Sequence, residues 1–471
     1  MAEAKTIAKP MKPNLYRVAA FLALWLAALP LQFPRAESAA QTTAAAGPEE
    51  IKVLLFSDLH FNPFSGLRSG VTNLSLNHPE SNWDPTDVSD HYQSDPSWFL
   101  IKSALENART NSPCAVLCLG DFVAHNFQAR CRQDHHLKTT PTETLFQTET
   151  LLAHVFQSTF TNRSAMFVPV LGNNDTTNDY SRPGQEFLQS FVAAWHGAVP
   201  PPQSVDETPK DFDDSFTNAG HYMVTLPAPL TNVVAIVFNS TIFSTSSAND
   251  DLAEAPDQIT WLNQSLQQAA RRQKHVWLLC HIPPGTNIFG FHDPFWAADY
   301  TSRFVHLVNQ ANAANPTDPL ITACFCGHTH MDEFKVICDA HSQPTAFIHI
   351  IPAISPDHRN NPAYQVLSVD RSGHILDYDT MYLANFNRLE FQDWSSAHPV
   401  WAREYRFSVE IRQRNRLTST NYDAACLYEW QLQIQHGTDL PHYFKRFYTV
   451  EAVKHPLFYG HWANDLLVPG E

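Results

Sequence analysis

Short apolar runs recur along the chain from residue 51 and alternate with segments of helical periodicity. The runs lack strict alternation of apolar and polar residues, which is typical of strands buried on both faces. Six strands are expected before residue 331: "IKVLLFS" (51–57), "CAVLCLG" (114–120), "MFVPVLG" (166–172), "VVAIVFNS" (233–240), "HVWLLCH" (275–281) and "ITACFCG" (321–327). Helical segments between consecutive strands indicate an α/β fold.

Helix-start signals support this interpretation. Thr140, Pro141 and Glu143 supply an N-cap, a first-turn proline and a first-turn acid before a helical pattern that continues to residue 160. Asp95 and Pro96 are expected to begin a helix in the same way before "SWFLIKSALENA". The segment "GQEFLQSFVAAW" has one apolar helix face, made by Phe187, Leu188, Phe191, Val192 and Trp195.

After residue 331 the pattern changes to successive strands, with "EFKVICD", "AFIHIIPAI", "AYQVLSVD" and "HILDYDTMYLA" in order. From about residue 386 the chain is rich in aromatic residues and mostly helical in pattern, with few strand signals. We therefore expect an α/β sandwich over residues 51–385 and a helical C-terminal subdomain over residues 386–471.

The N-terminal segment resembles an export signal. Four basic residues, the last of them Arg17, precede the apolar stretch "VAAFLALWLAALPL" (18–31), and small residues follow it. This pattern predicts a signal peptide over residues 1–40 and a linker over 41–50. Fourteen apolar residues are few for a membrane span, and an uncleaved anchor is the alternative. No later run reaches 18 apolar residues, so we expect a secreted, periplasmic or lumenal protein without an integral membrane segment after signal removal.

The net charge limits the kinds of partner that we expect, and the cysteine content bears on whether disulfides form. The formal net charge of −16 disfavours a nucleic-acid duplex, because its protein partners usually present a basic surface. Export permits disulfides among the eight cysteines, and we expect at least one, with Cys131, Cys338 and Cys426 as the best-placed candidates. The other five lie in apolar runs and are expected to be buried thiols: Cys114, Cys118, Cys280, Cys324 and Cys326.

Polar residues suited to metal binding follow five of the predicted strands. These residues are Asp58 and His60, Asp121, Asn173, His281, and finally His328 and His330. The carboxyl ends of strands in an α/β sheet line one crevice, so five such ends can converge. Carboxylates, imidazoles and a carboxamide oxygen are suitable ligands for a pair of divalent transition metals.

The spacing within two of these blocks is informative. Asp58 and His60 form a D-x-H pair, and His328 and His330 form an H-x-H pair. Residues i and i+2 of a strand face the same side, so we expect each pair to project into one pocket. A single pair is weak support, because buried, hydrogen-bonded histidines and aspartates are common. Five blocks in order are far more specific.

The order D-x-H, G-D, G-N-x-D, H and G-H-x-H resembles the calcineurin-like metallophosphoesterase superfamily over roughly residues 55–385. The stretches "SDLHFNP", "GDFVAHN", "HIPPG", "GHTHMDEF" and "ISPDHRNNPAYQV" are similar to its acid sphingomyelinase-like phosphodiesterase branch. The resemblance implies a four-layer αββα metallophosphoesterase sandwich, with the helical C-terminal extension, and a secreted binuclear-metal phosphodiesterase.

The resemblance also implies a ligand set. By their motifs, Asp58, His60 and His330 would hold one metal, Asn173, His281 and His328 would hold the other, and Asp121 would bridge both. Two divalent ions about 4 Å apart can share a hydroxide that attacks the phosphorus in line. The predominance of imidazole ligands and the oxidising environment of exported proteins favour Zn²⁺ for both ions.

Asn174 departs from the family pattern, since most relatives have a histidine there that contacts the phosphate. Asparagine cannot donate a proton in acid catalysis, so Asn174 is expected to hydrogen-bond a phosphoryl oxygen. His125 lies four residues after Asp121, a spacing at which the acid sphingomyelinase branch has a histidine proposed as proton donor. His125 and Asn174 are therefore the expected catalytic residues, with His125 as general acid; the alternative for His125 is a phosphate contact or loop position.

The expected substrate is a small-molecule or lipid-headgroup phosphodiester. The Asn-Asn-Asp sequence at 173–175 also resembles fungal endopolyphosphatases, so hydrolysis of polyphosphate or nucleotide phosphoanhydrides is the alternative activity. A non-catalytic scaffold is a third interpretation, but such proteins lose metal ligands, and this chain keeps all seven motif positions.

Overall fold

The predicted apolar runs form the central strands of two β-sheets in a computed structural model of the chain. The structure describes residues 50–134, 136–160, 165–199, 212–247, 254–286 and 293–437, together with Tyr443, Arg446, Leu466 and Leu467. The predicted signal peptide and all but the last residue of the predicted linker lie outside these residues. No helix within the described ranges is long and apolar enough to cross a membrane.

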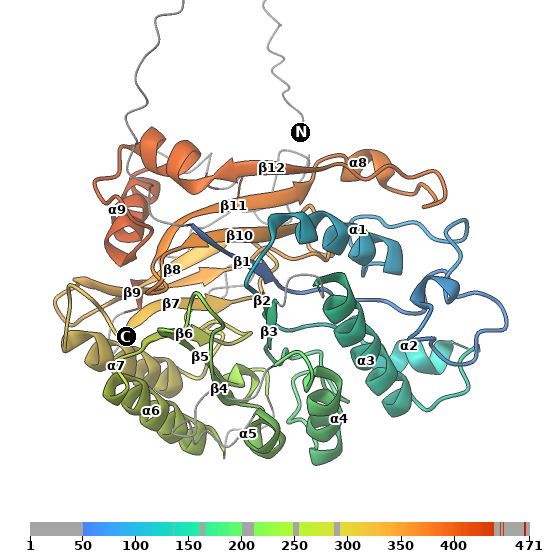
Figure 1. Cartoon of the computed structure of the whole chain (residues 1–471), viewed down its shortest axis with the longest axis horizontal. Helices are drawn as coiled ribbons and strands as arrows, with labels where there is room; N and C mark the ends of the chain where they lie inside the picture. Colours follow the sequence, from blue (N-terminus) through green and yellow to red (C-terminus); the bar gives the residue numbers. More distant parts are fainter. Residues whose placement is uncertain are drawn as a thin grey trace, which may run out of the picture. The chain divides into compact units, whose positions relative to one another are not determined.

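The first sheet has the strand order β12-β11-β10-β1-β2-β3 (Figure 1). Its strands are β1 (Ile51–Phe56), β2 (Ala115–Cys118), β3 (Met166–Pro169), β10 (Ala363–Val369), β11 (Ile375–Leu383) and β12 (Trp401–Arg406). Strands β1, β2 and β3 are mutually parallel, with Leu55 opposite Leu117 and Leu117 opposite Val168. Their carboxyl ends therefore meet at one edge of the sheet.

The second sheet has the order β13-β8-β9-β7-β6-β5-β4. Its strands are β4 (Tyr222–Thr225), β5 (Val233–Val237), β6 (His275–Leu279), β7 (Ile321–Cys326), β8 (Glu333–Cys338), β9 (Pro344–Ile350) and β13 (Leu466–Leu467). Strands β5, β6 and β7 are parallel, and β9 runs parallel to β7. This sheet also has a common carboxyl edge, from which the remaining predicted ligands project.

Helices pack around the two sheets. They are α1 (Trp98–Ala108), α2 (Phe127–Gln133), α3 (Pro141–Phe160), α4 (Gln185–Trp195), α5 (Phe212–Ala219), α6 (Ala255–Arg271), α7 (Ala298–Ala313), α8 (Phe386–Leu389) and α9 (Ala424–Gln435). Short 3₁₀ turns span Pro79–Ser81, Arg109–Asn111 and Ser240–Phe243, and a π-helix spans Phe407–Gln413. Figure 1 shows α1, α3 and α4 on one side of the sheets and α6 and α7 on the other.

The residues of β5 are all buried but alternate between two cores, which shows why the layers number four. Val234 and Ile236 belong to a core shared with α6 and α7, whereas Ala235 and Val237 belong to the core shared with the first sheet. The second sheet is thus buried on both faces, as the lack of polar alternation predicted. The predicted α/β sandwich of four layers is confirmed.

A local sequence signal marks the start of α3. In α3 the backbone N–H of Glu143 donates to Thr140 Oγ1 at 3.2 Å, and Glu143 Oε2 accepts from the N–H of Thr140 at 2.7 Å, which is the predicted capping box. The expected start of α1 was wrong. Its N-cap is Ser97, whose side chain accepts from the N–H of Leu100, so Asp95 is left for another contact.

The C-terminal region is less purely helical than expected. Strand β12 (Trp401–Arg406) pairs antiparallel with β11 and continues the first sheet. Its sequence "WAREYR" carries charged residues between aromatic ones, which suits an edge strand but weakens an apolar strand signal. The domain boundary between residues 385 and 386 stays a prediction.

The expected disulfide is wrong: all eight cysteines are free thiols. The three best-placed candidates lie on regular elements and not in loops. Cys131 is on α2, Cys338 on β8 and Cys426 on α9. The five cysteines of the apolar runs also remain thiols, and all but Cys114 are fully buried.

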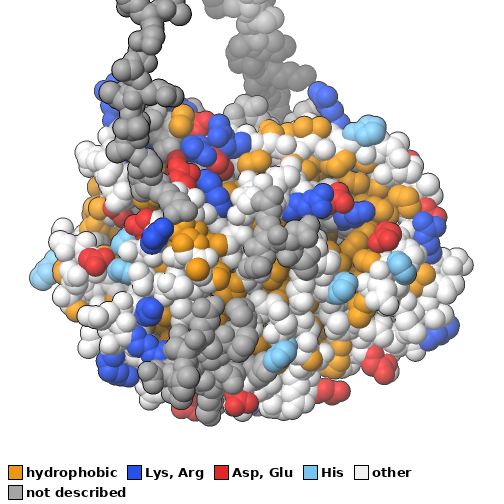
Figure 2. All heavy atoms as spheres, in the orientation of Figure 1, with side chains coloured by type: hydrophobic (Ala, Val, Ile, Leu, Met, Phe, Trp, Pro, Cys, Tyr) orange, Lys and Arg blue, Asp and Glu red, His pale blue; other side chains and the backbone are white. Residues whose placement is uncertain are grey.

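On the described part of the face in Figure 2, basic and acidic side chains are interspersed.

Candidate active site

The D-x-H pair lies beyond the end of β1, not on the strand. Asp58 and His60 have positive φ angles of 49° and 43°, a conformation uncommon for residues other than glycine. Backbone hydrogen bonds hold this loop, because the N–H of Asp58 donates to Gly120 O at 3.0 Å and the N–H of His60 to Asp121 O at 2.9 Å. The expectation that strand periodicity aims the pair was therefore wrong; the left-handed loop does so.

The same conformation recurs at the other strand ends. Asp121 follows β2 with φ 55°, and His328 and His330 follow β7 with φ 75° and 64°. Five of the seven predicted ligands thus have left-handed backbones. Such conformations persist only where surrounding contacts enforce them, and they concentrate at functional sites.

The loop after β3 brings Asn173 close to Asp121. A Cβ atom on Gly172 would lie 2.2 Å from both the backbone N and Oδ1 of Asp121, so only glycine allows this approach. The Asp175 carboxylate accepts from the N–H of Gly172 at 2.9 Å. It also accepts from three N–H groups of the neighbouring loop, those of Asp121, Phe122 and Val123. Asp175 therefore joins the two loops through the backbone.

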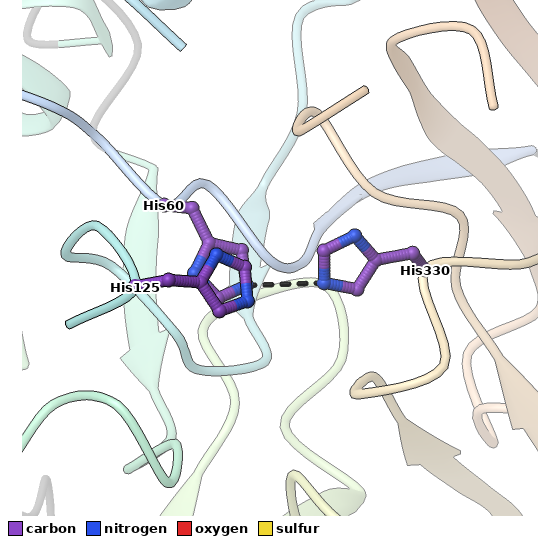
Figure 3. Close-up of side chains that lie close together, drawn as sticks. All are labelled: His60, His125 and His330. Carbon is purple, nitrogen blue, oxygen red and sulfur yellow. Dashed lines mark hydrogen bonds between the residues drawn. The ribbon is translucent and has the colours of Figure 1, made fainter. Parts of the chain in front are cut away.

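One group of nitrogens and oxygens meets around Asp58, His60 and His330. His60 Nε2 lies 3.0 Å from His330 Nε2, the contact drawn in Figure 3. Asp58 Oδ1 lies 3.8 Å from His60 Nε2 and 3.5 Å from His330 Nε2. The three side chains thus face one point between the ends of β1 and β7.

A second group meets around Asp121. Its Oδ2 lies 3.2 Å from His281 Nε2, and Asn173 Oδ1 lies 3.1 Å from the same nitrogen. Asp121, His281 and His328 together offer ligand atoms within 4.8 Å of one another. Asp121 Oδ2 is also 3.5 Å from His60 Nε2, so this carboxylate belongs to both groups. All seven predicted ligands are therefore brought together.

The donor set fits divalent metals. Asp58, His60, Asp121, Asn173, His281 and His330 are each no more than 2% exposed. Among the described residues, no lysine or arginine forms an ion pair with Asp58 or Asp121. Two buried carboxylates without a cation are costly. The Nδ1 atoms of His60 and His330 also lack a hydrogen-bond partner. A pair of cations within this cluster would compensate the charge.

The protonation states of His328 and His330 also favour a metal site. Burial lowers the pKa of His328 to about 3 and that of His330 well below its usual range. Both imidazoles are neutral at ordinary pH, as metal ligands must be. His281 differs, because the charge and hydrogen bond of Asp121 outweigh burial and raise its pKa to about 10. Its Nδ1 donates to Leu119 O at 2.7 Å, which orients Nε2 toward Asp121 and Asn173.

His125 lies against the first group. Its ring stacks on that of His60, with centroids 3.7 Å apart, as Figure 3 shows. Its Nδ1 lies 2.7 Å from Asp95 Oδ1, and Arg130 Nη2 lies 2.5 Å from Asp95 Oδ2. Burial alone lowers the pKa of His125, but the hydrogen bond and charge of Asp95 outweigh it and raise that pKa to about 9.

Asn174 points to Asp121. Its Nδ2 donates to Asp121 Oδ2 at 2.7 Å, and its backbone N–H donates to Asp121 Oδ1 at 2.8 Å. The side chain is 4% exposed. Asn174 therefore supports the shared carboxylate, a contact that the sequence analysis did not foresee.

Two further residues border the site without having been predicted. Asp95 was interpreted as a helix cap, and no local sequence signal pairs it with a histidine 30 residues later. The ring of His358 lies 4.3 Å from that of His330 in an edge-on arrangement. His358 belongs to "ISPDHRNNPAYQV", a stretch similar to the acid sphingomyelinase-like branch in which the sequence predicted no site residue.

Comparison with known proteins gives one family and several relatives. The family model for calcineurin-like phosphoesterases matches residues 51–332. "Sphingomyelinase phosphodiesterase D" of Dictyostelium discoideum is 25% identical over 331 residues, which cover 67% of this chain and 66% of the relative. "Acid sphingomyelinase-like phosphodiesterase 3b" of Mus musculus is 21% identical over 383 residues, which cover 77% of this chain and 74% of the relative.

The solved structures similar to this chain include a dimetal phosphatase from Danio rerio. It has a TM-score of 0.41 and 12% identity, with 71% of this chain and 96% of that chain covered. The chain spans just under two thirds of the length of the Dictyostelium discoideum relative.

Proposed function

We propose that this chain, which belongs to the calcineurin-like phosphoesterase family and is a metal-dependent phosphoric ester hydrolase, cleaves phosphodiesters at the cluster around Asp121. The shared position of Asp121 carries the proposal. Its Oδ2 lies 3.2 Å from His281 Nε2 and 3.5 Å from His60 Nε2, so one carboxylate serves both ligand groups. A bridging carboxylate is what a binuclear centre requires.

In this proposal two divalent ions, most suitably Zn²⁺, share the cluster. Asp58, His60 and His330 would hold one ion, Asn173, His281 and His328 would hold the other, and Asp121 would contribute to both. When bound, such a pair neutralises phosphoryl charge and makes a water nucleophilic near neutral pH. The protein's part is to fix the ligands, which the left-handed loops and the Asp175 contacts do.

His125 supplies the proton to the leaving oxygen. Its Nδ1–H donates to Asp95, so the atom that carries the transferable proton is Nε2. Asp95 holds the ring in place and favours the charged form, while Arg130 fixes Asp95 from the other side. Asn174 holds Asp121 in position through its side-chain amide and does not take part in proton transfer.

The substrate class is a small-molecule or lipid-headgroup phosphodiester. The names of the relatives, sphingomyelinase phosphodiesterase and acid sphingomyelinase-like phosphodiesterase, support a diester. The endopolyphosphatase alternative rests on the resemblance of the Asn-Asn-Asp sequence at 173–175 to fungal endopolyphosphatases. Because the relatives named above are phosphodiesterases, we assign diester hydrolysis as the activity.

A four-substrate panel tests the proposal. The purified protein, supplemented with zinc, is assayed on bis-p-nitrophenyl phosphate, p-nitrophenyl phosphorylcholine, a nucleoside triphosphate and long-chain polyphosphate. We expect the two diesters to give the highest kcat/KM. Faster turnover of polyphosphate or nucleoside triphosphate would favour phosphoanhydride hydrolysis, and no turnover on any of the four would favour a scaffold.

We also propose export of the protein. The basic residues and the 14-residue apolar stretch near the N-terminus support a signal peptide ending by residue 40. N-terminal sequencing of protein recovered from the medium or the periplasm tests this. A mature chain that still begins with the apolar stretch would indicate an uncleaved anchor.

A further inference from the structure

A second cluster of potential ligands lies at the opposite end of β6 from the active site. His275 is the first residue of β6, while His281 follows the strand's last residue by two positions. At about 3.3 Å per residue, the two lie about 20 Å apart along the chain. Asp318 precedes β7, and His374 lies in the turn between β10 and β11.

The three side chains converge. His275 Nε2 lies 3.7 Å from Asp318 Oδ1, and His374 Nε2 lies 3.8 Å from the same oxygen. The two imidazole rings have centroids 5.2 Å apart and stand edge to face. The side chains are 18%, 57% and 32% exposed for His275, Asp318 and His374, so water and ions can reach them.

Each histidine is oriented through its other ring nitrogen. His275 Nδ1 lies 3.2 Å from Pro319 O, and His374 Nδ1 lies 3.3 Å from Asp370 Oδ2. Because a carbonyl and a carboxylate only accept hydrogen bonds, Nδ1 is the protonated nitrogen in both neutral rings. The lone pair is therefore on Nε2, which faces Asp318. A histidine whose outer nitrogen donates to a carbonyl or carboxylate is the usual arrangement at metal sites.

The supporting turn is itself ordered by Asp370. Its Oδ1 accepts from the backbone N–H of Ser372 at 2.8 Å and of His374 at 3.0 Å. The same turn is tied to the second sheet, because Trp277 Nε1 donates to Gly373 O at 2.9 Å. His374 is thus held in place by contacts that do not depend on an ion.

We propose that His275, Asp318 and His374 form a further zinc site that links the two sheets. Ligand atoms of a tetrahedral zinc ion with bonds of about 2.0–2.1 Å lie about 3.3 Å apart. Small side-chain rotations bring the separations of 3.7 and 3.8 Å to this value. A cavity of about 350 Å³ that His374, Asp370 and Pro319 help to line adjoins the cluster, which leaves room for water as the fourth ligand.

This site has a structural role. His275 belongs to the second sheet, and His374 connects two strands of the first sheet. An ion held by both joins elements 99 positions apart in the sequence. Because only the folded chain brings these ligands together, bound zinc stabilises the folded state. The site does not depend on the proposed function, since its ligands differ from those of the catalytic cluster.

Zinc content tests the site directly. The full-length wild type, His374→Ala and Asp318→Asn are incubated with excess zinc, desalted and analysed for zinc per chain. His154→Ala, a substitution of an exposed histidine on α3, is the matched control. We expect both site variants to hold one equivalent fewer than wild type and the control to match wild type. Hydrolysis of bis-p-nitrophenyl phosphate should be unchanged in all three variants.

Thermal melting at increasing zinc concentration gives an independent readout. Loss of a second-shell contact typically weakens metal binding about 10- to 100-fold, so loss of the His374 ligand should raise the half-saturating zinc concentration by at least about 100-fold. Equal zinc content and equal melting curves for wild type and His374→Ala would overturn the site. If the catalytic cluster proved to bind no metal, the difference of one equivalent would still remain, so the two proposals can fail separately.

Discussion

Asp95 Oδ1 lies 2.7 Å from His125 Nδ1, and the same carboxylate accepts from the backbone N–H of His125 at 3.2 Å. The imidazole is therefore held at two points by one side chain while its ring stacks on His60. The two ring nitrogens therefore have different roles, because Nδ1 hydrogen-bonds Asp95 and Nε2 is available for proton transfer. The predictions on the proton donor follow from this pair.

Replacing Asp95 with asparagine should weaken proton donation without removing the donor. Asn keeps the size of the side chain but loses the charge that raises the pKa of His125. We expect kcat to fall about 10- to 100-fold on an alkyl diester, part of the 10²- to 10⁴-fold effect typical of general acid catalysis. Because His125 must be protonated to act, the descending alkaline limb of the pH–rate profile should shift to lower pH. Asp299→Asn, which alters an exposed pair with Arg303, is the control and should leave both unchanged.

His125→Ala should discriminate between leaving groups. A nitrophenolate departs without protonation, whereas an alkoxide requires a proton in the transition state. We expect a loss of about 10²- to 10⁴-fold on an alkyl diester and a much smaller loss on bis-p-nitrophenyl phosphate. Equal losses on both substrates, with metal content intact, would show that the proton does not come from His125.

Asn174→Ala should act through the metal centre. The substitution removes the hydrogen bond to Asp121 Oδ2 but leaves the backbone hydrogen bond to Oδ1. Contacts of this kind typically account for about 10- to 100-fold in metal affinity or activity. The penalty should therefore be similar for nitrophenyl and alkyl diesters and should decrease when zinc is added in excess. A penalty confined to one leaving group would instead show that Asn174 acts on the leaving group and not through the metal centre.

Much of the fold could be predicted from the sequence, because short segments of the chain determine many of its strands and helices. Buried strands such as β2 and β5 are unbroken apolar runs, and the Thr140–Glu143 capping box marks α3 with no help from the rest of the chain. Edge strand β12 was missed because charged residues interrupt its sequence and leave no apolar strand signal. The convergence of the strand ends was also predictable, since parallel strands share an edge.

The parts that sequence reasoning missed depend on contacts between distant residues. The Asp95–His125 pair joins a loop before α1 to the loop after β2, and no periodicity encodes it. The left-handed backbones at Asp58 and His60 follow from hydrogen bonds to Gly120 and Asp121. The absence of disulfides has a similar origin, because pairing depends on the distances between cysteines in the folded chain, which the sequence does not show.

His349 should make the protein sensitive to acid. Its Nε2 donates to Gln365 Oε1 at 2.6 Å, and its Nδ1 accepts from the Tyr422 hydroxyl. Burial lowers the pKa of His349 from 6.5 to about 4. Between these values the unfolded chain binds the proton and the folded chain does not. The free energy of unfolding therefore falls as pH drops from 6.5 to 4, by up to about 3 kcal/mol.

Urea unfolding at pH 7 and pH 4.5 measures this effect. The difference in unfolding free energy between the two pH values should be smaller for His349→Gln than for wild type. His154→Gln, at an exposed position on α3, should behave as wild type. An undiminished acid dependence in His349→Gln would assign the acid sensitivity to other groups.

The most direct test of a binuclear phosphodiesterase is a metal titration of activity. The His374→Ala variant, which removes the proposed sheet-linking site, is stripped with a chelator and titrated with zinc while hydrolysis of bis-p-nitrophenyl phosphate is followed. We predict that activity is lost on stripping, rises with added zinc and reaches its plateau at two equivalents per chain. Asp121→Asn in the same background should not recover. Full activity in stripped protein, or a plateau at one equivalent, would contradict the account.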